Sequence, residues 1–161
     1  MNDSFLQRRL IQPLLLLLKQ GVTPEKLALS LALGVVLGIF PILGSTTALC
    51  AIAAVVLKLN LPAIQIVNYF VYPIQIALLI AFFRLGEIVF RAPHFPISVP
   101  QIREMAHASL WMTIRMLWTT TWHAVVVWSI LAPIAVTTLY FILTPLLRYR
   151  RRRQSVLTSV K

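Results

Sequence analysis

The chain contains few residues that could carry out covalent chemistry. Among its 161 residues are four acidic residues, three histidines and one cysteine. They are spread out, with no paired carboxylates, no metal-ligand spacing and no nucleophile beside an evident base. We therefore expect no enzymatic activity, no metal and no cofactor. Cys50 stands alone and cannot form an intrachain disulfide, so we expect it to pack as a small apolar side chain.

Polar groups that could bind a ligand gather instead at a break in an uncharged run, residues 27–57. Pro41 lacks a backbone N–H, and Gly44 tolerates conformations that other residues avoid, so a helix should end here. Three hydroxyl residues follow: Ser45, Thr46 and Thr47. They can cap a second helix, whose free N–H groups carry a partial positive charge. Half-helix ends of this kind bind anionic groups or ions in transporters, and the alternative is an ordinary turn between two short helices.

A stripe of polar side chains follows in the next uncharged run, residues 59–83. Its members are spaced by three or four residues: Gln65, Asn68, Tyr72 and Gln75. Polar side chains in a membrane span normally face the bundle interior, and Pro73 frees the carbonyl of Tyr69 for another partner. The stripe can bond across helices or line a substrate path. It contains nothing that ionises near neutral pH, which argues against a proton relay.

Small residues recur every four positions in the first part of the uncharged run, at Ser30, Gly34 and Gly38. This spacing places them on one helix face, where another backbone can approach closely. We interpret the face as a helix-packing groove. The functional alternative is a groove along which a ligand or a lipid chain slides.

The composition indicates that lipid surrounds these elements, because 59% of the residues are hydrophobic and only 12% are charged. The uncharged runs 27–57, 59–83 and 116–147 contain 31, 25 and 32 residues. A helix of the first run would be about 46 Å long, well beyond the hydrocarbon core of about 30 Å, so the break must divide it. Arms of about 14 residues reach about 21 Å, which favours a re-entrant hairpin over two crossings and leaves both open.

The distribution of lysine and arginine predicts the orientation. Four of the fifteen lie in residues 1–26, one at Lys58, four in residues 84–115, and six from Arg148 onward. Placing both ends in the cytoplasm puts eleven of them on that side. An even number of crossings follows, and Lys58 returns to the cytoplasm under either reading of the first run.

We therefore predict an all-α, polytopic membrane protein with a broken or re-entrant helical hairpin, two full transmembrane helices and interfacial amphipathic helices. The predicted segments are a cytoplasmic interfacial helix in 1–22, a membrane domain in 23–90 with the hairpin 27–57 and a span 61–83, an external loop and amphipathic helix in 91–117, a last transmembrane helix in 118–147, and a basic cytoplasmic tail in 148–161.

Two helix starts carry recognisable signals. Thr23 is a predicted N-cap, with Pro24 at the first helical position and Glu25 against the positive helix end. Ser98 and Gln101 have capping-box spacing for a helix outside the membrane. One stripe of that helix recurs every four residues: Arg103, His107, Trp111 and Arg115.

The C-terminal tail carries a cluster of arginines: Arg148, Arg150, Arg151, Arg152 and Arg153. A basic cluster directly after an apolar span marks the cytoplasmic side and attracts anionic lipid head groups. We expect anionic lipids of the cytoplasmic leaflet as partners, and no nucleic acid.

Three spaced motifs occur within residues 21–62: Gly21-x-x-Pro24-x-x-x-Ala28, Gly34-x-x-x-Gly38-x-x-Pro41-x-x-Gly44-x-x-Thr47, and Leu59-Asn60-Leu61-Pro62. They resemble the bacterial membrane family called domain of unknown function 2062, over about residues 13–90. Family members commonly continue with an Asn-Pro pair, whereas here Asn68 stands apart and Tyr72 precedes Pro73. The resemblance implies a small multi-pass protein of the bacterial inner membrane and no established activity.

Two functions fit these features. The first is a structural or accessory role in the cell envelope, in which the small-residue faces pack with a second copy or with another envelope protein. The alternative is a small transporter or lipid-handling protein that binds an anionic head group or an ion at the half-helix end, Pro41 to Thr47.

Overall fold

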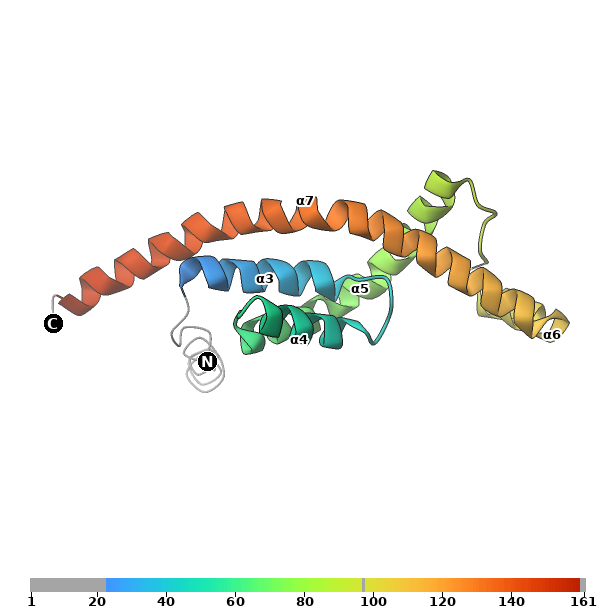
Figure 1. The fold of residues 1–161 in the computed structure, drawn as a ribbon, viewed down its shortest axis with the longest axis horizontal. Coiled ribbons are helices and arrows are strands. Elements are labelled where there is room, and N and C mark those ends of the chain that lie inside the picture. The colour runs from blue at the N-terminus through green and yellow to red at the C-terminus, as the bar shows by residue number, and fades with distance from the viewer. Residues whose placement is uncertain (1–22, 97, 160–161) are drawn as a thin grey trace, which may run out of the picture.

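The computed structural model describes residues 23–96 and 98–159. These residues form five helices and no strand (Figure 1): α3 (Pro24–Gly38), α4 (Thr46–Val56), α5 (Leu61–Phe90), α6 (Val99–Ala108) and α7 (Leu110–Ser159). The predicted all-α fold is confirmed for this part of the chain. The predicted interfacial helix in residues 1–22 lies outside the described residues.

Helix α3 begins where the capping signal predicts. The hydroxyl of Thr23 accepts a hydrogen bond from the Lys26 amide at 3.3 Å, and Pro24 occupies the first turn. The helix ends at Gly38, before Pro41, whose ring cannot continue a helix.

A bend, residues 39–45, reverses the chain between α3 and α4. Gly44 has a φ of +84°, a left-handed conformation that residues with a Cβ adopt at a cost. Ser45 precedes α4 without capping it, because its hydroxyl donates to the Ile42 carbonyl at 2.8 Å. The predicted break therefore produces a helical hairpin, α3–bend–α4.

This hairpin packs along α5. Asn60 caps α5 by accepting a hydrogen bond from the Ala63 amide at 2.9 Å, and its own N–H donates to the Ser30 hydroxyl at 3.1 Å. The start of α5 is thereby fixed beside α3. Figure 1 shows α3 between α7 and the α4–α5 pair, so α3 has the most buried position in the bundle. Its inward side chains are small: Ala28, Ala32 and Val36.

Helices α5 and α7 are long and apolar enough to cross a membrane, α7 over Leu110–Tyr149. Their outward surfaces are rich in large apolar side chains such as Phe70, Ile134 and Phe141. Such surfaces suit contact with lipid, because lipid keeps the apolar side chains out of water.

The boundaries in the C-terminal half differ from the prediction. One amphipathic helix was expected to run from Ser98 through Arg115, ahead of a separate span at 118–147. The structure instead breaks the chain at Ser109, and α7 continues unbroken from Leu110 to Ser159. The break lies at Ser109. Its N–H donates the last hydrogen bond of α6, to the Met105 carbonyl, and its hydroxyl accepts a hydrogen bond from the Met112 amide at 3.3 Å, which caps the start of α7.

Candidate functional site

The small-residue face of α3 lies against α5 of the same chain. A Cβ added to Gly34 would lie 2.8 Å from the Ile64 carbonyl oxygen and 2.9 Å from Val67 Cβ. At Gly38 it would lie 3.2 Å from Asn68 Oδ1. With the Ser30–Asn60 hydrogen bond, these contacts fill the groove along its length. A second protein would therefore have to contact a different face of this molecule.

The carbonyl end of α3 receives hydrogen bonds from two long helices. Gln75 Nε2 of α5 donates to the Phe40 carbonyl at 2.7 Å, and Trp128 Nε1 of α7 donates to the Val36 carbonyl at 3.1 Å. The Trp128 ring also meets the Phe40 ring edge to face at 4.8 Å. Helix ends leave carbonyls without partners inside the helix, and such groups are costly in an apolar environment. Both donors therefore stabilise a helix end that stops inside the bundle.

Gln75 itself is 1% exposed, and its Oε1 has no hydrogen-bond partner among the described residues. A buried acceptor without a donor is unfavourable. Its amide nitrogen, by contrast, is satisfied by the bend. Gln75 therefore serves the bend as a donor.

At the amino end of α4 the polar groups differ in exposure, because Thr47 is exposed, Gln65 is half-buried and Asn68 is buried. The exposed Thr47 contributes its carbonyl, which accepts from Gln65 Nε2 at 2.9 Å, and its hydroxyl, which lies 3.5 Å from Asn68 Nδ2. Asn68 Nδ2 also donates to Gln65 Oε1 at 3.3 Å. The Ser45 side chain makes no capping hydrogen bond to the first amides of α4. We call Thr47, Gln65 and Asn68 the polar cluster.

The structure thus divides the predicted polar stripe among three environments. Gln65 and Asn68 join the amino end of α4, and Gln75 joins the carbonyl end of α3. Tyr72 is exposed between them. In the predicted binding bend, Pro41 and Thr46 are buried, whereas Gly44 and Thr47 are exposed. Sequence reasoning missed Trp128 as a partner of the bend: it was read only as part of an aromatic belt, since 92 positions separate it from Val36.

At one end of the bundle, α7 is tied to the start of α3. Arg148 Nε lies 2.7 Å from Glu25 Oε1, and Lys26 Nζ lies 3.5 Å from the Lys58 carbonyl. The pKa of Glu25 is lowered, first by a hydrogen bond with the backbone and then by Arg148. The other arginines of the predicted lipid-binding tail, residues 150–153, continue α7, and their side chains lie outside the description.

At the other end, a buried carboxylate holds the loop after α5. Glu87 is 3% exposed and accepts hydrogen bonds from Arg84 Nη1 at 2.8 Å and from the Phe95 amide at 2.8 Å. His94 Nδ1 lies 2.9 Å from the same carboxylate. Nearby, His123 of α7 stacks on Phe90 with the rings 4.1 Å apart.

Within the described residues, no three His, Cys, Asp or Glu side chains could share a metal ion. Cys50 is buried in an apolar cluster with Ala54 and Ile64.

Comparison with known proteins gives one match. No curated protein and no solved structure matches the chain. Residues 5–155 match the family described as an uncharacterized protein conserved in bacteria, DUF2062. That match covers nearly the whole sequence, including the hairpin and both long helices, and so extends the predicted resemblance well beyond residue 90. The chain belongs to the DUF2062 family.

Proposed function

We propose that this protein is a multi-pass protein of the bacterial inner membrane with a structural or accessory role in the cell envelope. In this proposal α5 and α7 cross the membrane. The α3–bend–α4 hairpin enters from the cytoplasmic side and turns back inside the membrane, and both chain ends are cytoplasmic.

The proposal rests on the position along α5 and α7 at which these two helices contact the bend. Gln75, which binds the bend, lies about 21 Å along α5 from Leu61, and about 17 Å before Gly86, at 1.5 Å per helical residue. A bend at that height lies within a hydrocarbon core of about 30 Å. The donors Gln75 and Trp128 supply what a helix end needs there.

Helices α5 and α7 cover the same distance between the cytoplasmic end and the outer end of the bundle. Gly86 of α5 lies beside His123 of α7, with a Cβ-to-Cβ separation of 3.0 Å for an added Cβ. From Gly86 back to Leu61, and from His123 on to Arg148, the helices each run about 37 Å. Both stretches fit one membrane with its interfaces. Lys26, Lys58 and Arg148 then gather at the cytoplasmic level, as the positive-inside rule requires.

Orientation is testable with single cysteines in a Cys50→Ala background. We expect Ser98→Cys to react with a membrane-impermeant thiol reagent in intact cells. Ser155→Cys should react only after permeabilisation. Reaction of Ser155 from outside, or protection of Ser98, would contradict the orientation.

The accessory role predicts a partner that contacts a surface other than the α3 groove. In-membrane cross-linking of the full-length chain should give a discrete product, from a second copy or another envelope protein. Only monomer after cross-linking, with nothing co-purifying in mild detergent, would contradict this role.

A second function, lipid handling, is favoured by the polar cluster and the uncapped amino end of α4. Positive helix ends attract anionic groups, and Thr47, Gln65 and Asn68 add further polar contacts. Liposomes containing the protein should then move a labelled anionic lipid between leaflets, and Thr47→Val should slow this. Thr138→Val is the matched control, because its hydroxyl only bonds back to Ile134. Equal movement with and without protein would refute the lipid-handling function.

A further inference from the structure

The hairpin formed by α6 and the first part of α7, residues 99–122, extends beyond the rest of the bundle (Figure 1). The base of this hairpin is fixed at the outer end of the bundle by the contact of His123 with Gly86. The contacts of Glu87 with Arg84, His94 and Phe95, which we call the Glu87 network, hold the loop beside it. The 13 residues of α7 before His123 would reach about 20 Å further. We call residues 99–122 the outer hairpin.

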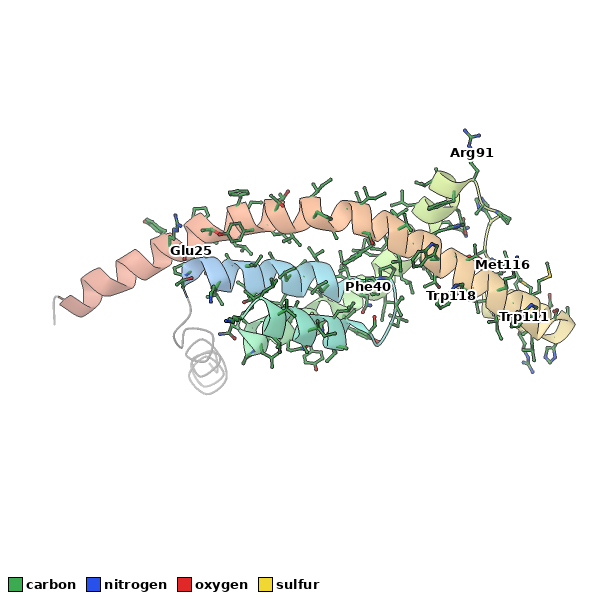
Figure 2. The ribbon with its side chains drawn as sticks, in the orientation of Figure 1. Glu25, Phe40, Arg91, Trp111, Met116 and Trp118 are labelled. Carbon is green, nitrogen blue, oxygen red and sulfur yellow. The ribbon has the colours of Figure 1, made fainter. Side chains whose placement is uncertain are left out.

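The outer hairpin packs its small polar side chains inward and its large apolar side chains outward. Thr113 and Thr120 are buried at 4% and 8% exposure. Trp111 and Trp118 are 76% and 72% exposed, and Figure 2 shows both on the part of α7 that lies away from α3 and α4. In water this arrangement would be unfavourable, so another medium or molecule must cover these side chains.

The width of the apolar surface indicates which covering fits. Leu110, Ile114 and Met112 flank the tryptophans and are exposed as well. At about 100° per residue these five side chains spread over about 200° of the helix, opposite Thr113 and Thr120. A helix that packs against one neighbour typically shows an apolar stripe of about 100° or more. Because lipid surrounds a helix on every free side, a surface about twice that width suits contact with lipid.

The arginine and threonine side chains of the outer hairpin are also compatible with contact with lipid. Among the described residues, neither Arg103 nor Arg115 forms an ion pair, and both are exposed. Arg115 falls on the same side of α7 as Trp111 and Trp118, and a long arginine side chain can reach head-group phosphates while its stem stays in apolar surroundings. Thr113 donates to the Ser109 carbonyl just before α7, and Thr119 donates to the Arg115 carbonyl of α7, so neither hydroxyl needs water.

We infer that the outer hairpin lies in the outer leaflet of the same membrane, with α6 toward water and the Trp111–Trp118 side of α7 in lipid. Arg103 and Arg115 bind the phosphates of anionic head groups there. The curvature of α7 in Figure 1 turns its amino-terminal part away from the direction of its central part, as this position requires. The inference rests on the proposed membrane crossing of α7.

The test uses the full-length chain with Cys50→Ala and a single environment-sensitive fluorophore on an introduced cysteine. Three positions are compared: Ile114 on the apolar side, Glu104 on α6 as the water-side control, and Ile134 in the middle of the span. The protein is reconstituted in phosphatidylcholine vesicles with or without phosphatidylglycerol. Iodide reports water contact, and nitroxide-labelled lipids report lipid contact.

The Ile114 probe is expected to be quenched by shallow nitroxide lipids and protected from iodide, with the Glu104 probe quenched by iodide. Phosphatidylglycerol should strengthen the lipid quenching at Ile114, and Arg103→Gln with Arg115→Gln should abolish that dependence. Iodide quenching at Ile114, or protection from both quenchers by a protein partner, would overturn the inference while the Ile134 probe remains in lipid. Loss of lipid contact at Ile134 would instead refute the membrane crossing itself.

Discussion

At the scale of single residues, the most consequential contacts are those that complete the helix ends at the bend. Trp128 donates to the Val36 carbonyl in the last turn of α3, and Gln75 donates to the Phe40 carbonyl in the bend. Both pairs are far apart in sequence, so no local pattern could have identified them. What the sequence could predict was local: the cap at Thr23, and the end of the helix before Pro41.

Trp128→Phe should destabilise the folded protein by about 1–3 kcal/mol, because the Phe ring can still contact Phe40 while the Val36 carbonyl loses its half-buried donor. Denaturant unfolding in mixed micelles measures the change. Trp122→Phe is the matched control, since Trp122 is exposed, and its effect should stay within about 0.5 kcal/mol. Equal effects of the two substitutions would contradict a capping role for Trp128.

The contacts of the small-residue face make a second prediction about single residues. Gly34→Ala should cost about 1–3 kcal/mol, because the added Cβ would press on the backbone of α5 at Ile64. Gly38→Ala should cost less, because the nearest atoms to its added Cβ, Asn68 Oδ1 and Cα, lie 3.2 and 3.3 Å away, farther than the 2.8 Å contact at Gly34. The same unfolding assay ranks the two variants, and the reverse order would argue against this packing.

At the scale of elements, the sequence predicted the α3–bend–α4 hairpin better than it predicted the outer hairpin. Pro41 and Gly44 are strong breakers, and the structure breaks there. Ser109 is a weak breaker, set in a region where the four-residue stripe continues on both sides. It turns the chain only because its backbone and hydroxyl end one helix and begin the next. That dual use depends on α6 packing back against α7, which periodicity does not reveal.

The Glu87 network should control how firmly the loop after α5 is held. Glu87→Gln keeps the shape and removes the charge that pairs with Arg84, so the loop should be released more often. Cleavage after Arg91 by trypsin added outside spheroplasts measures this, and we expect faster cleavage in the variant. Glu104→Gln, which changes an exposed acid, should leave the rate unchanged. An unchanged rate in Glu87→Gln would show that other contacts hold the loop.

At the scale of the whole molecule, the proposed position in the membrane depends on two levels, one at each end of the bundle. Separate sets of contacts define them: the cytoplasmic level by Glu25, Lys58 and Arg148, and the outer level by Gly86 and His123. The sequence places the uncharged run 59–83 between these levels, but Arg84 also precedes Gly86, and the run 116–147 begins seven residues before His123. It left the first run open between a re-entrant hairpin and two crossings, because that choice depends on where the bend meets α5 and α7.

The depth of the bend is the most direct test of this account. A single cysteine at Ser45, in the Cys50→Ala background, is treated in intact cells with a membrane-impermeant thiol reagent, with Ser98→Cys as the accessible control. In a re-entrant hairpin, Ser45→Cys is protected from outside and reacts with a lipid-soluble maleimide. Labelling of Ser45→Cys from outside as readily as Ser98→Cys would mean that α3 and α4 cross the membrane separately, and would contradict the re-entrant hairpin.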